Sequence, residues 1–209
     1  MSPAIGLRAE TLTPFAYHSL AVQGGTATLP ELISDNALAF GLAGTLGWMR
    51  ASGALPEKDY RRDLGVMPWR ASLLIADDPR LLPPLARRLN LEEEGGYQKK
   101  LRDVTYKGNL KQFWTTQEVP PGAVFRGALF GIDPFEETGQ TSLVIRIGLH
   151  RNGMLKLTRD DSIEQVRLNA ATAALFGREL AVERFLLYGL QLTEWMPLTQ
   201  AGEEVARWT

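Results

Sequence analysis

The chain has 209 residues, of which 44% are apolar and 22% are charged, and its formal net charge is −1. This composition is that of an ordinary globular protein, long enough to bury a core without metal or disulfide staples. Because the chain has no cysteine, it excludes a disulfide framework, a cysteine-ligated zinc site, an iron–sulfur cluster and a cysteine nucleophile.

The N-terminal region predicts two extended segments and then a helix. Apolar residues alternate with polar or small ones over residues 5–9, which is strand periodicity, and more weakly over 15–20. Ser34 or Asp35 can cap the free N–H groups of a helix that should run to about residue 52.

Three glycines lie among the apolar residues of this expected helix: Gly41, Gly44 and Gly47. Glycine lowers helix stability, so their presence predicts close approach by the backbone of another element. A glycine at every third position of a helical pattern indicates packing and not a phosphate loop. The chain has no P-loop or dinucleotide-binding motif.

The middle of the chain predicts mixed structure around one long insertion. A short helix is expected near residues 57–64 and strand structure over 69–76. Residues 81–89 are predicted to be helical, with two prolines moving the true start later. Residues 91–119 show no assignable periodicity, and a long irregular stretch in a compact protein is often functional.

The C-terminal half predicts mainly strands. Strands are expected at 123–130, 142–149 and 154–158, with an Asn-Gly turn between the last two. Shorter segments are expected as a strand over 166–169, a helical turn over 170–176, and a helix or a strand over 181–195. With no obvious linker, residues 1–209 are interpreted as one domain.

No metal, cofactor or self-sufficient catalytic site is expected. The only histidines, His18 and His150, lack an acidic residue at a ligand spacing. The acidic pairs at 77–78 and 160–161 lie at expected element ends, where such residues usually cap helices or face water. Tyr17 and His18, with lysines elsewhere, could serve a metal-independent ribonuclease, but we favour His18 as a strand residue that faces solvent or a partner.

The stretch from Tyr97 to Trp114 is basic in a chain that is slightly acidic overall. Five cations and one anion, Asp103, give it a net charge of +4. The cations are Lys99, Lys100, Arg102, Lys107 and Lys111, and the interleaved aromatic residues include Tyr106 and Trp114. Such a mixture suits single-stranded nucleic acid, with cations on phosphates and rings on bases. A solvated basic loop whose aromatic rings fold onto the core is an equal alternative.

A second basic group is expected on and around the C-terminal hairpin. It comprises Arg146, His150, Arg151 and Lys156, with Arg126 contributed from the neighbouring strand. The alternative is ordinary outward-facing charge on an antiparallel sheet.

Several segments, in this order, resemble the RAMP superfamily of CRISPR-associated proteins. They are Ser-Asp-Asn-Ala-Leu-Ala-Phe-Gly-Leu (34–42), the basic insertion, Glu-Val-Pro-Pro-Gly-Ala-Val-Phe (118–125) and Leu-Val-Ile-Arg-Ile-Gly-Leu (143–149) before a glycine-containing hairpin. The sequence is most similar to the subunit that caps the 5′ end of guide RNA in class 1 effector complexes, particularly the type I-D version. The glycine-rich C-terminal loop of many RAMP proteins is not evident here.

The resemblance implies a fold and a set of partners. The fold would be α+β, with a ferredoxin-like, RRM-related antiparallel-sheet core and a long basic loop or β-hairpin thumb at about 91–119. The chain would bind the 5′ handle of the guide RNA in a Cascade-like ribonucleoprotein complex for antiviral defence. It would contact the large and backbone subunits, and possible contact with target DNA is left open.

Two other functions are kept as alternatives: a metal-independent endoribonuclease that processes precursor guide RNA, and an RNA-free protein–protein scaffold. The N-terminus has no basic flank, and no apolar run is long enough for a signal peptide or a membrane span. A cytoplasmic protein that does not interact with membranes is therefore expected.

Overall fold

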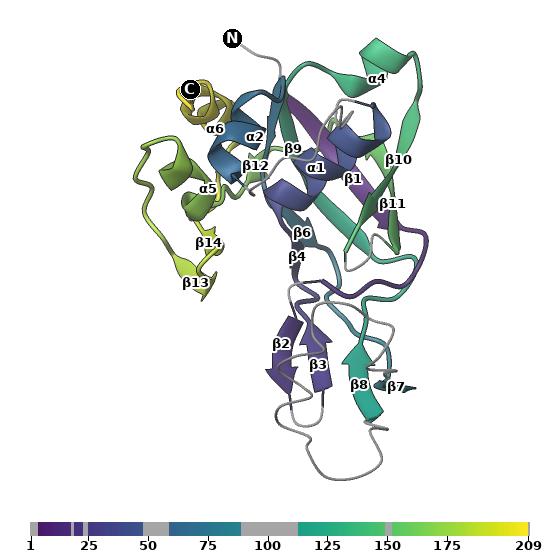
Figure 1. Cartoon of the computed structure of the whole chain (residues 1–209). Coiled ribbons are helices and arrows are strands. Elements are labelled where there is room, and N and C mark those ends of the chain that lie inside the picture. Colours follow the sequence, from purple (N-terminus) through teal and green to yellow (C-terminus); the bar gives the residue numbers. More distant parts are fainter. Residues whose placement is uncertain are drawn as a thin grey trace.

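A curled antiparallel sheet forms the body of the protein, and a four-stranded sheet projects from it as an arm (Figure 1). The computed structural model describes residues 4–17, 19–22, 25–47, 59–88, 113–148 and 152–208. The α+β prediction with an antiparallel-sheet core is confirmed.

The main sheet has seven strands, and all its pairings are antiparallel. They are β1 (Ala4–Thr11), β4 (Leu32–Ile33), β5 (Trp69–Ala71), β6 (Leu74–Ala76), β9 (Val124–Gly131), β10 (Ser142–Ile147) and β11 (Gly153–Arg159). The order is β10-β11-β1-β9-β6-β4, and β5 also pairs with β9. The central strand is β1, where Ala9 lies between Leu157 of β11 and Phe125 of β9.

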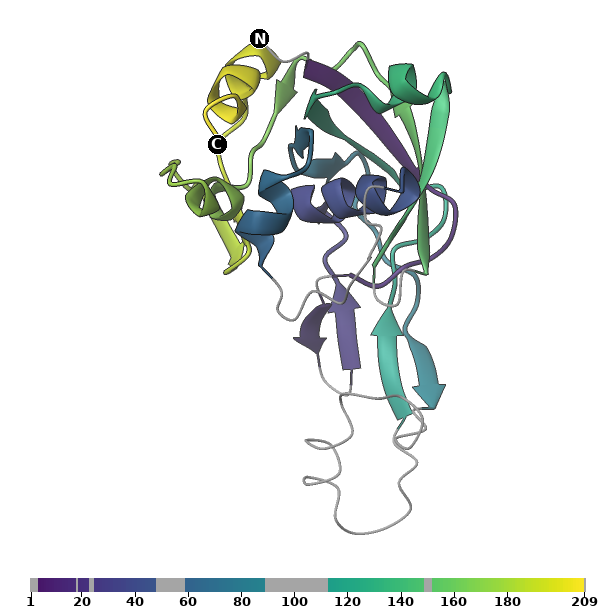
Figure 2. The same ribbon diagram turned by 45° about the horizontal axis from the view of Figure 1, so that its top comes forward.

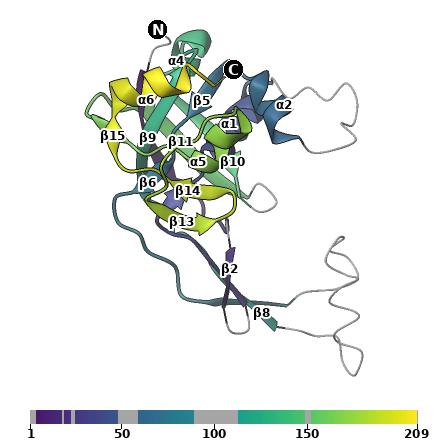
Figure 3. The ribbon, with the colours of Figure 1, turned by 90° about the vertical axis from the view of Figure 1, so that its left-hand side faces the viewer.

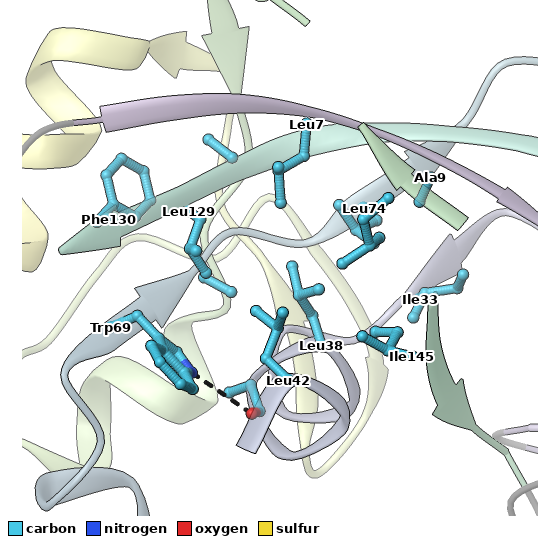
Figure 4. Packing of buried hydrophobic residues seen from close by; sticks show 14 of the residues in the cluster. Leu7, Ala9, Ile33, Leu38, Leu42, Trp69, Leu74, Leu129, Phe130 and Ile145 are labelled. Atoms are coloured by element: carbon cyan, nitrogen blue, oxygen red, sulfur yellow. Dashed lines mark hydrogen bonds between the residues drawn. The ribbon is translucent and has the colours of Figure 1, made fainter. Parts of the chain in front are cut away.

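Helix α1 (Asp35–Thr45) packs its apolar side against this sheet. It starts where predicted, because the Ser34 hydroxyl accepts a hydrogen bond from the Ala37 N–H. Leu38 and Leu42 are fully buried and point toward the side chains of the sheet (Figure 4). This contact of helix and sheet forms the centre of the hydrophobic core.

The three helix glycines have different roles. A Cβ on Gly41 would lie 2.9 Å from Ile145 Cδ1 and 3.2 Å from the Arg146 carbonyl oxygen, so the predicted close approach is confirmed there, against β10. Gly44 has no atom within 4 Å of its Cβ position, so the prediction is wrong at that residue. Gly47 lies just beyond the helix with a φ of 75°, a conformation that favours glycine.

The arm is a sheet of two hairpin-like pairs. Its strands are β2 (Ser19–Val22), β3 (Gly25–Thr28), β7 (Leu85–Arg88) and β8 (Phe113–Gln117), in the order β2-β3-β8-β7. The central pair, β3 and β8, is parallel, and both outer pairs are antiparallel. Figure 2 shows the arm extending from the body in a second view.

The helix predicted over residues 81–89 is wrong, because β7 occupies that segment. Proline lacks a donor and disfavours the helical conformation in the residue before it, so Pro83 and Pro84 keep the chain extended. Leu82 donates its N–H to the Glu118 carbonyl at 2.8 Å, which starts the pairing with the β8 region. Long-range pairing thus overrides the local apolar spacing.

The remaining elements lie around the body, with α4 on the side opposite to the C-terminal elements (Figure 1). They are α2 (Tyr60–Gly65), α4 (Pro134–Thr138), β12 (Gln165–Val166), α5 (Ala170–Leu175), β13 (Arg184–Leu187), β14 (Leu190–Leu192), β15 (Met196–Pro197) and α6 (Leu198–Val205). The segment 181–195, for which either a helix or a strand was expected, contains the hairpin β13–β14, which faces the viewer in Figure 3. Helices α4 and α6 were not predicted. No helix in the described ranges is long and apolar enough to cross a membrane.

Candidate nucleic-acid interface

The arm connects to the predicted basic stretch through strands β7 and β8. The backbones of Arg88 and Phe113 are direct partners in this antiparallel pair, as are those of Arg87 and Trp114. The chain therefore leaves the arm and returns to it at neighbouring positions. Residues 89–112, which link these two positions in the sequence, lie outside the described residues.

Most of the predicted RNA-binding residues lie outside the described ranges: Lys99, Lys100, Arg102, Tyr106, Lys107, Lys111, His150 and Arg151. The turn predicted between β10 and β11 lies partly outside them as well. Trp114 is placed by its backbone in β8, and Arg126 and Arg146 lie on the main sheet. The structure thus locates three of the predicted residues on two different sheets.

Of the cations predicted to bind RNA or to lie near the hairpin, those that the structure describes are on the outer face of the main sheet. Along β10, Leu143, Ile145 and Ile147 are buried, whereas Arg146 is exposed, as strand alternation requires. Lys156 is exposed on the adjacent strand β11. Neither Arg146 nor Lys156 forms an ion pair with any described residue, so both charges are available to a ligand.

Arg126 differs from these two cations because carboxylates hold it. Its Nε lies 3.0 Å from both oxygens of Asp77, and its Nη1 contacts Asp160. The hydrogen bonds and charges of these acids, those of Asp77 above all, raise the pKa of Arg126. A phosphate would have to compete with two carboxylates at this position.

Three of the four acids in the pairs considered as metal ligands, Asp77, Asp78 and Asp160, interact with other side chains. Asp160 accepts hydrogen bonds from Ser162, which are the main cause of its lowered pKa, as well as from Arg126. Asp78 lies 3.7 Å from Arg80. Within the described part of the chain, no group of three or more histidine or acidic side chains could hold a metal ion.

Tyr17, the aromatic residue of the nuclease alternative, is tied to the core. Its hydroxyl lies 2.6 Å from the Ser34 hydroxyl that caps α1. Burial is the main cause that raises the pKa of the Tyr17 phenol. His18 lies outside the described residues. The structure therefore gives Tyr17 a role in fixing the start of the helix.

A buried polar cluster, not predicted from the sequence, joins α1 to the C-terminal region. The Asp35 carboxylate accepts a hydrogen bond from Asn169 Nδ2 at 2.9 Å. The same amide nitrogen donates to Thr172 and to the Gly189 carbonyl, and Asn169 Oδ1 accepts from the Gln191 N–H. Burial raises the pKa of Asp35, with no cation among its causes. Asn169 also caps α5. A capping residue before an alanine-rich run is the one local sequence signal that points to Asn169.

An exposed aromatic surface on the β13–β14 hairpin was also missed. Tyr188 is 90% exposed in the turn and Phe185 is 57% exposed on β13. Their ring centroids are 5.8 Å apart in an edge-to-face arrangement. We call this hairpin, residues 182–195 with its flanks, the aromatic hairpin.

Comparison with known proteins gives partial structural similarities, two of which are to chains of CRISPR complexes. No protein-family model and no curated protein matches the chain. A chain of a solved "Type IV-B CRISPR Complex" is similar over 77% of this chain and 91% of its own length, with 10% identity and a TM-score of 0.42. A chain of the type III-B Cmr-beta complex, solved with cognate target RNA and AMPPnP, is similar over 92% of this chain and 83% of its own, with 13% identity and a TM-score of 0.44. Neither similarity identifies a family.

Proposed function

We propose that this chain is a noncatalytic, guide-RNA-binding subunit of a CRISPR effector complex. In this role it holds the 5′ handle of the guide RNA and contacts neighbouring protein subunits. The observation that carries the proposal is the arm, because its paired strands β7 and β8 flank the basic, aromatic stretch in the sequence. A slightly acidic chain binds RNA best when its cations are gathered at one place.

The order of the main-sheet strands supports a RAMP-like, ferredoxin-related core. Strands β1, β6, β9 and β11 lie in the order β11-β1-β9-β6, all antiparallel, and α1 follows β1 in the chain. This is the strand arrangement of a βαββαβ unit in which the fourth strand lies beside the first. The chain departs from that unit after β9, where it has the short helix α4 and the additional edge strand β10.

The noncatalytic part of the proposal is supported by the position of Tyr17. A general acid or base must reach the reacting atoms and exchange protons near the working pH. The Tyr17 hydroxyl is engaged with Ser34, and burial raises its pKa away from that range. Cleavage of a repeat hairpin by the purified chain in EDTA, abolished by His18→Ala, would instead establish the endoribonuclease alternative.

The RNA-binding role is tested by charge reversal in the insertion. A tagged chain is expressed with its native operon, and the RNA that co-purifies is quantified and its 5′ ends are sequenced. The triple variant Lys99→Glu, Lys100→Glu and Lys107→Glu should lose about tenfold or more of this RNA, because phosphate contacts dominate affinity. The wild type should yield one sharp 5′ end with a common short leader.

The matched control reverses three exposed arginines elsewhere: Arg61→Glu, Arg80→Glu and Arg207→Glu. This control changes the net charge by the same amount, so it should retain RNA if the effect is local. Equal RNA loss in both triple variants would reject the assignment of the insertion. An intact complex without RNA would favour the scaffold alternative.

A second pair of variants tests the outer face of the main sheet. Arg146→Gln removes a cation that forms no ion pair with the described residues, whereas Arg126→Gln removes one that two carboxylates already hold. We expect Arg146→Gln to weaken RNA retention and to make it more salt-sensitive, and Arg126→Gln to leave retention nearly unchanged. The reverse ranking would show that Arg126 leaves its carboxylates to bind RNA.

A further inference from the structure

We propose that the aromatic hairpin is a docking site for an extended segment of another protein chain that carries apolar and basic side chains. The segment would add as a strand to the free edge of β13. This inference rests on the proposed membership of a multisubunit complex, but not on the RNA-binding role.

Exposed apolar side chains are concentrated at this hairpin. Among the large hydrophobic residues that are exposed in the described ranges, four fall within a stretch of the chain from 182 to 195: Val182, Phe185, Tyr188 and Trp195. The others are scattered as single residues along the described chain. A gathered apolar surface usually marks an interaction site, and aromatic residues are the commonest anchors of protein interfaces.

One backbone edge of the hairpin is open. Among the residues that the structure describes, strand β13 pairs only with β14. The other edge of β14 is occupied, since Thr193 donates its N–H to the Leu168 carbonyl at 3.1 Å and Leu192 forms a bridge with Asn169. An open strand edge offers unpaired N–H and C=O groups, which is the basis of strand addition.

The base of the hairpin is fixed to the body, so its exposed face is preorganised. Leu190 and Leu192 are buried with Leu32 and Leu73 in a second hydrophobic cluster. Asn169 holds the carbonyl of Gly189 at 2.9 Å. A site that is already ordered loses less conformational entropy when a partner binds.

The arginines of this region are neutralised by glutamates. Arg178 contacts both carboxylate oxygens of Glu204, at 2.9 and 3.0 Å. Arg184 contacts both oxygens of Glu31, one of them at 3.0 Å. These bidentate pairs leave little positive charge to attract RNA phosphates.

The uncompensated charge at the hairpin is acidic. Glu183 is paired with Arg167, whereas Glu179 and Glu194 are exposed and form no ion pair with the described residues. Uncompensated glutamates that flank the hairpin in the sequence repel a phosphate backbone and attract lysine or arginine side chains. This charge decides between an RNA and a protein occupant, and it favours a basic protein segment over a second copy of the same acidic surface.

The test places a photo-crosslinker in the hairpin of the assembled complex. Tyr188 is replaced with p-benzoylphenylalanine in the tagged chain, expressed with its native operon, and the purified assembly is irradiated. The crosslinked peptide is identified by mass spectrometry. The matched control carries the same group in place of Val66, which is 76% exposed.

The expected result is one dominant adduct with a partner protein, at a segment in which apolar residues alternate and lysine or arginine is present. Phe185→Ser together with Tyr188→Ser should lower recovery of that partner about tenfold. Because both side chains are exposed, the fold should be retained, with an unchanged circular dichroism spectrum.

Three results would overturn the inference: an adduct with RNA, an adduct with a second copy of this chain, or no adduct above the level at position 66. Co-purifying RNA is measured on the same samples. If the assembly contains no RNA but the hairpin adduct still forms, only the RNA-binding role is rejected. If RNA is present but the adduct does not form, only the docking site is rejected.

Discussion

Alanine substitution at Gly41 and Gly44 should change stability in opposite directions, although both residues lie in α1. Alanine is better than glycine inside a helix by about 1 kcal/mol, and this gain is common to both sites. At Gly44 nothing lies within 4 Å of the new methyl group. Gly44→Ala should therefore raise the free energy of unfolding by up to about 1 kcal/mol.

At Gly41 the new methyl group meets Ile145 Cδ1 at 2.9 Å and the Arg146 carbonyl oxygen at 3.2 Å. Ile145 is fully buried, so its side chain has little room to move away. Overpacking of this kind costs about 1–3 kcal/mol, which exceeds the helix gain on average. Gly41→Ala should thus lower the free energy of unfolding by about 1 kcal/mol.

Urea denaturation followed by circular dichroism measures both variants against the wild type. The stabilisation from replacing glycine with alanine in a helix is common to both variants, so it cancels in the difference between their free energies of unfolding. That difference therefore isolates the contact between α1 and β10. It should be about 1–3 kcal/mol with unchanged m-values. Equal stabilisation by both substitutions would refute the close packing of α1 on β10.

Two further predictions concern carboxyl groups and are tested by urea titrations across pH. Burial raises the pKa of Asp35 above its ordinary value of 3.8, so its ionisation costs folded-state stability as the pH rises. The free energy of unfolding of Asp35→Asn should therefore rise relative to that of the wild type as the pH increases above about 4, by at most about 1.4 kcal/mol per pH unit. The hydrogen bonds from Arg178 are the main cause that lowers the pKa of Glu204 below 4.5, so their stabilisation is present above that pH and is lost as the pH falls through the folded-state pKa. Glu204→Gln should be less stable than the wild type at pH 7, and this difference should shrink as the pH falls below about 4.5. A difference that is constant with pH would contradict either assignment.

Strands with one buried face were predictable because their side chains alternate. In β1, apolar residues alternate with polar or small ones over residues 5–9, and the pattern alone places the strand. The start of α1 was predictable from Ser34, because a cap is a local interaction. The β13 region defeated the same reasoning, since Phe185 is exposed and apolar and so removes the alternation.

The parts of the candidate site that depend on distant residues could not be predicted. The arginine at position 126 looked like a free cation because Asp77 and Asp160 approach it only in the folded chain. Likewise, Asp35 and Asn169 are 134 residues apart in sequence. Composition identified the basic insertion, but only strand pairing showed that its two ends meet at the arm.

The parallel pairing of β3 with β8 has a consequence for the order of assembly during synthesis. Gly25 lies beside Thr115, so β3 leaves the ribosome about 90 residues before its neighbour exists. Until then the β2–β3 hairpin is an isolated two-stranded unit, which is marginally stable in water. Contacts between residues so far apart form late, because a long loop must close first. The four-stranded arm therefore cannot be complete until β8 has been synthesised, and a ribosome stalled before residue 113 would carry a chain without it.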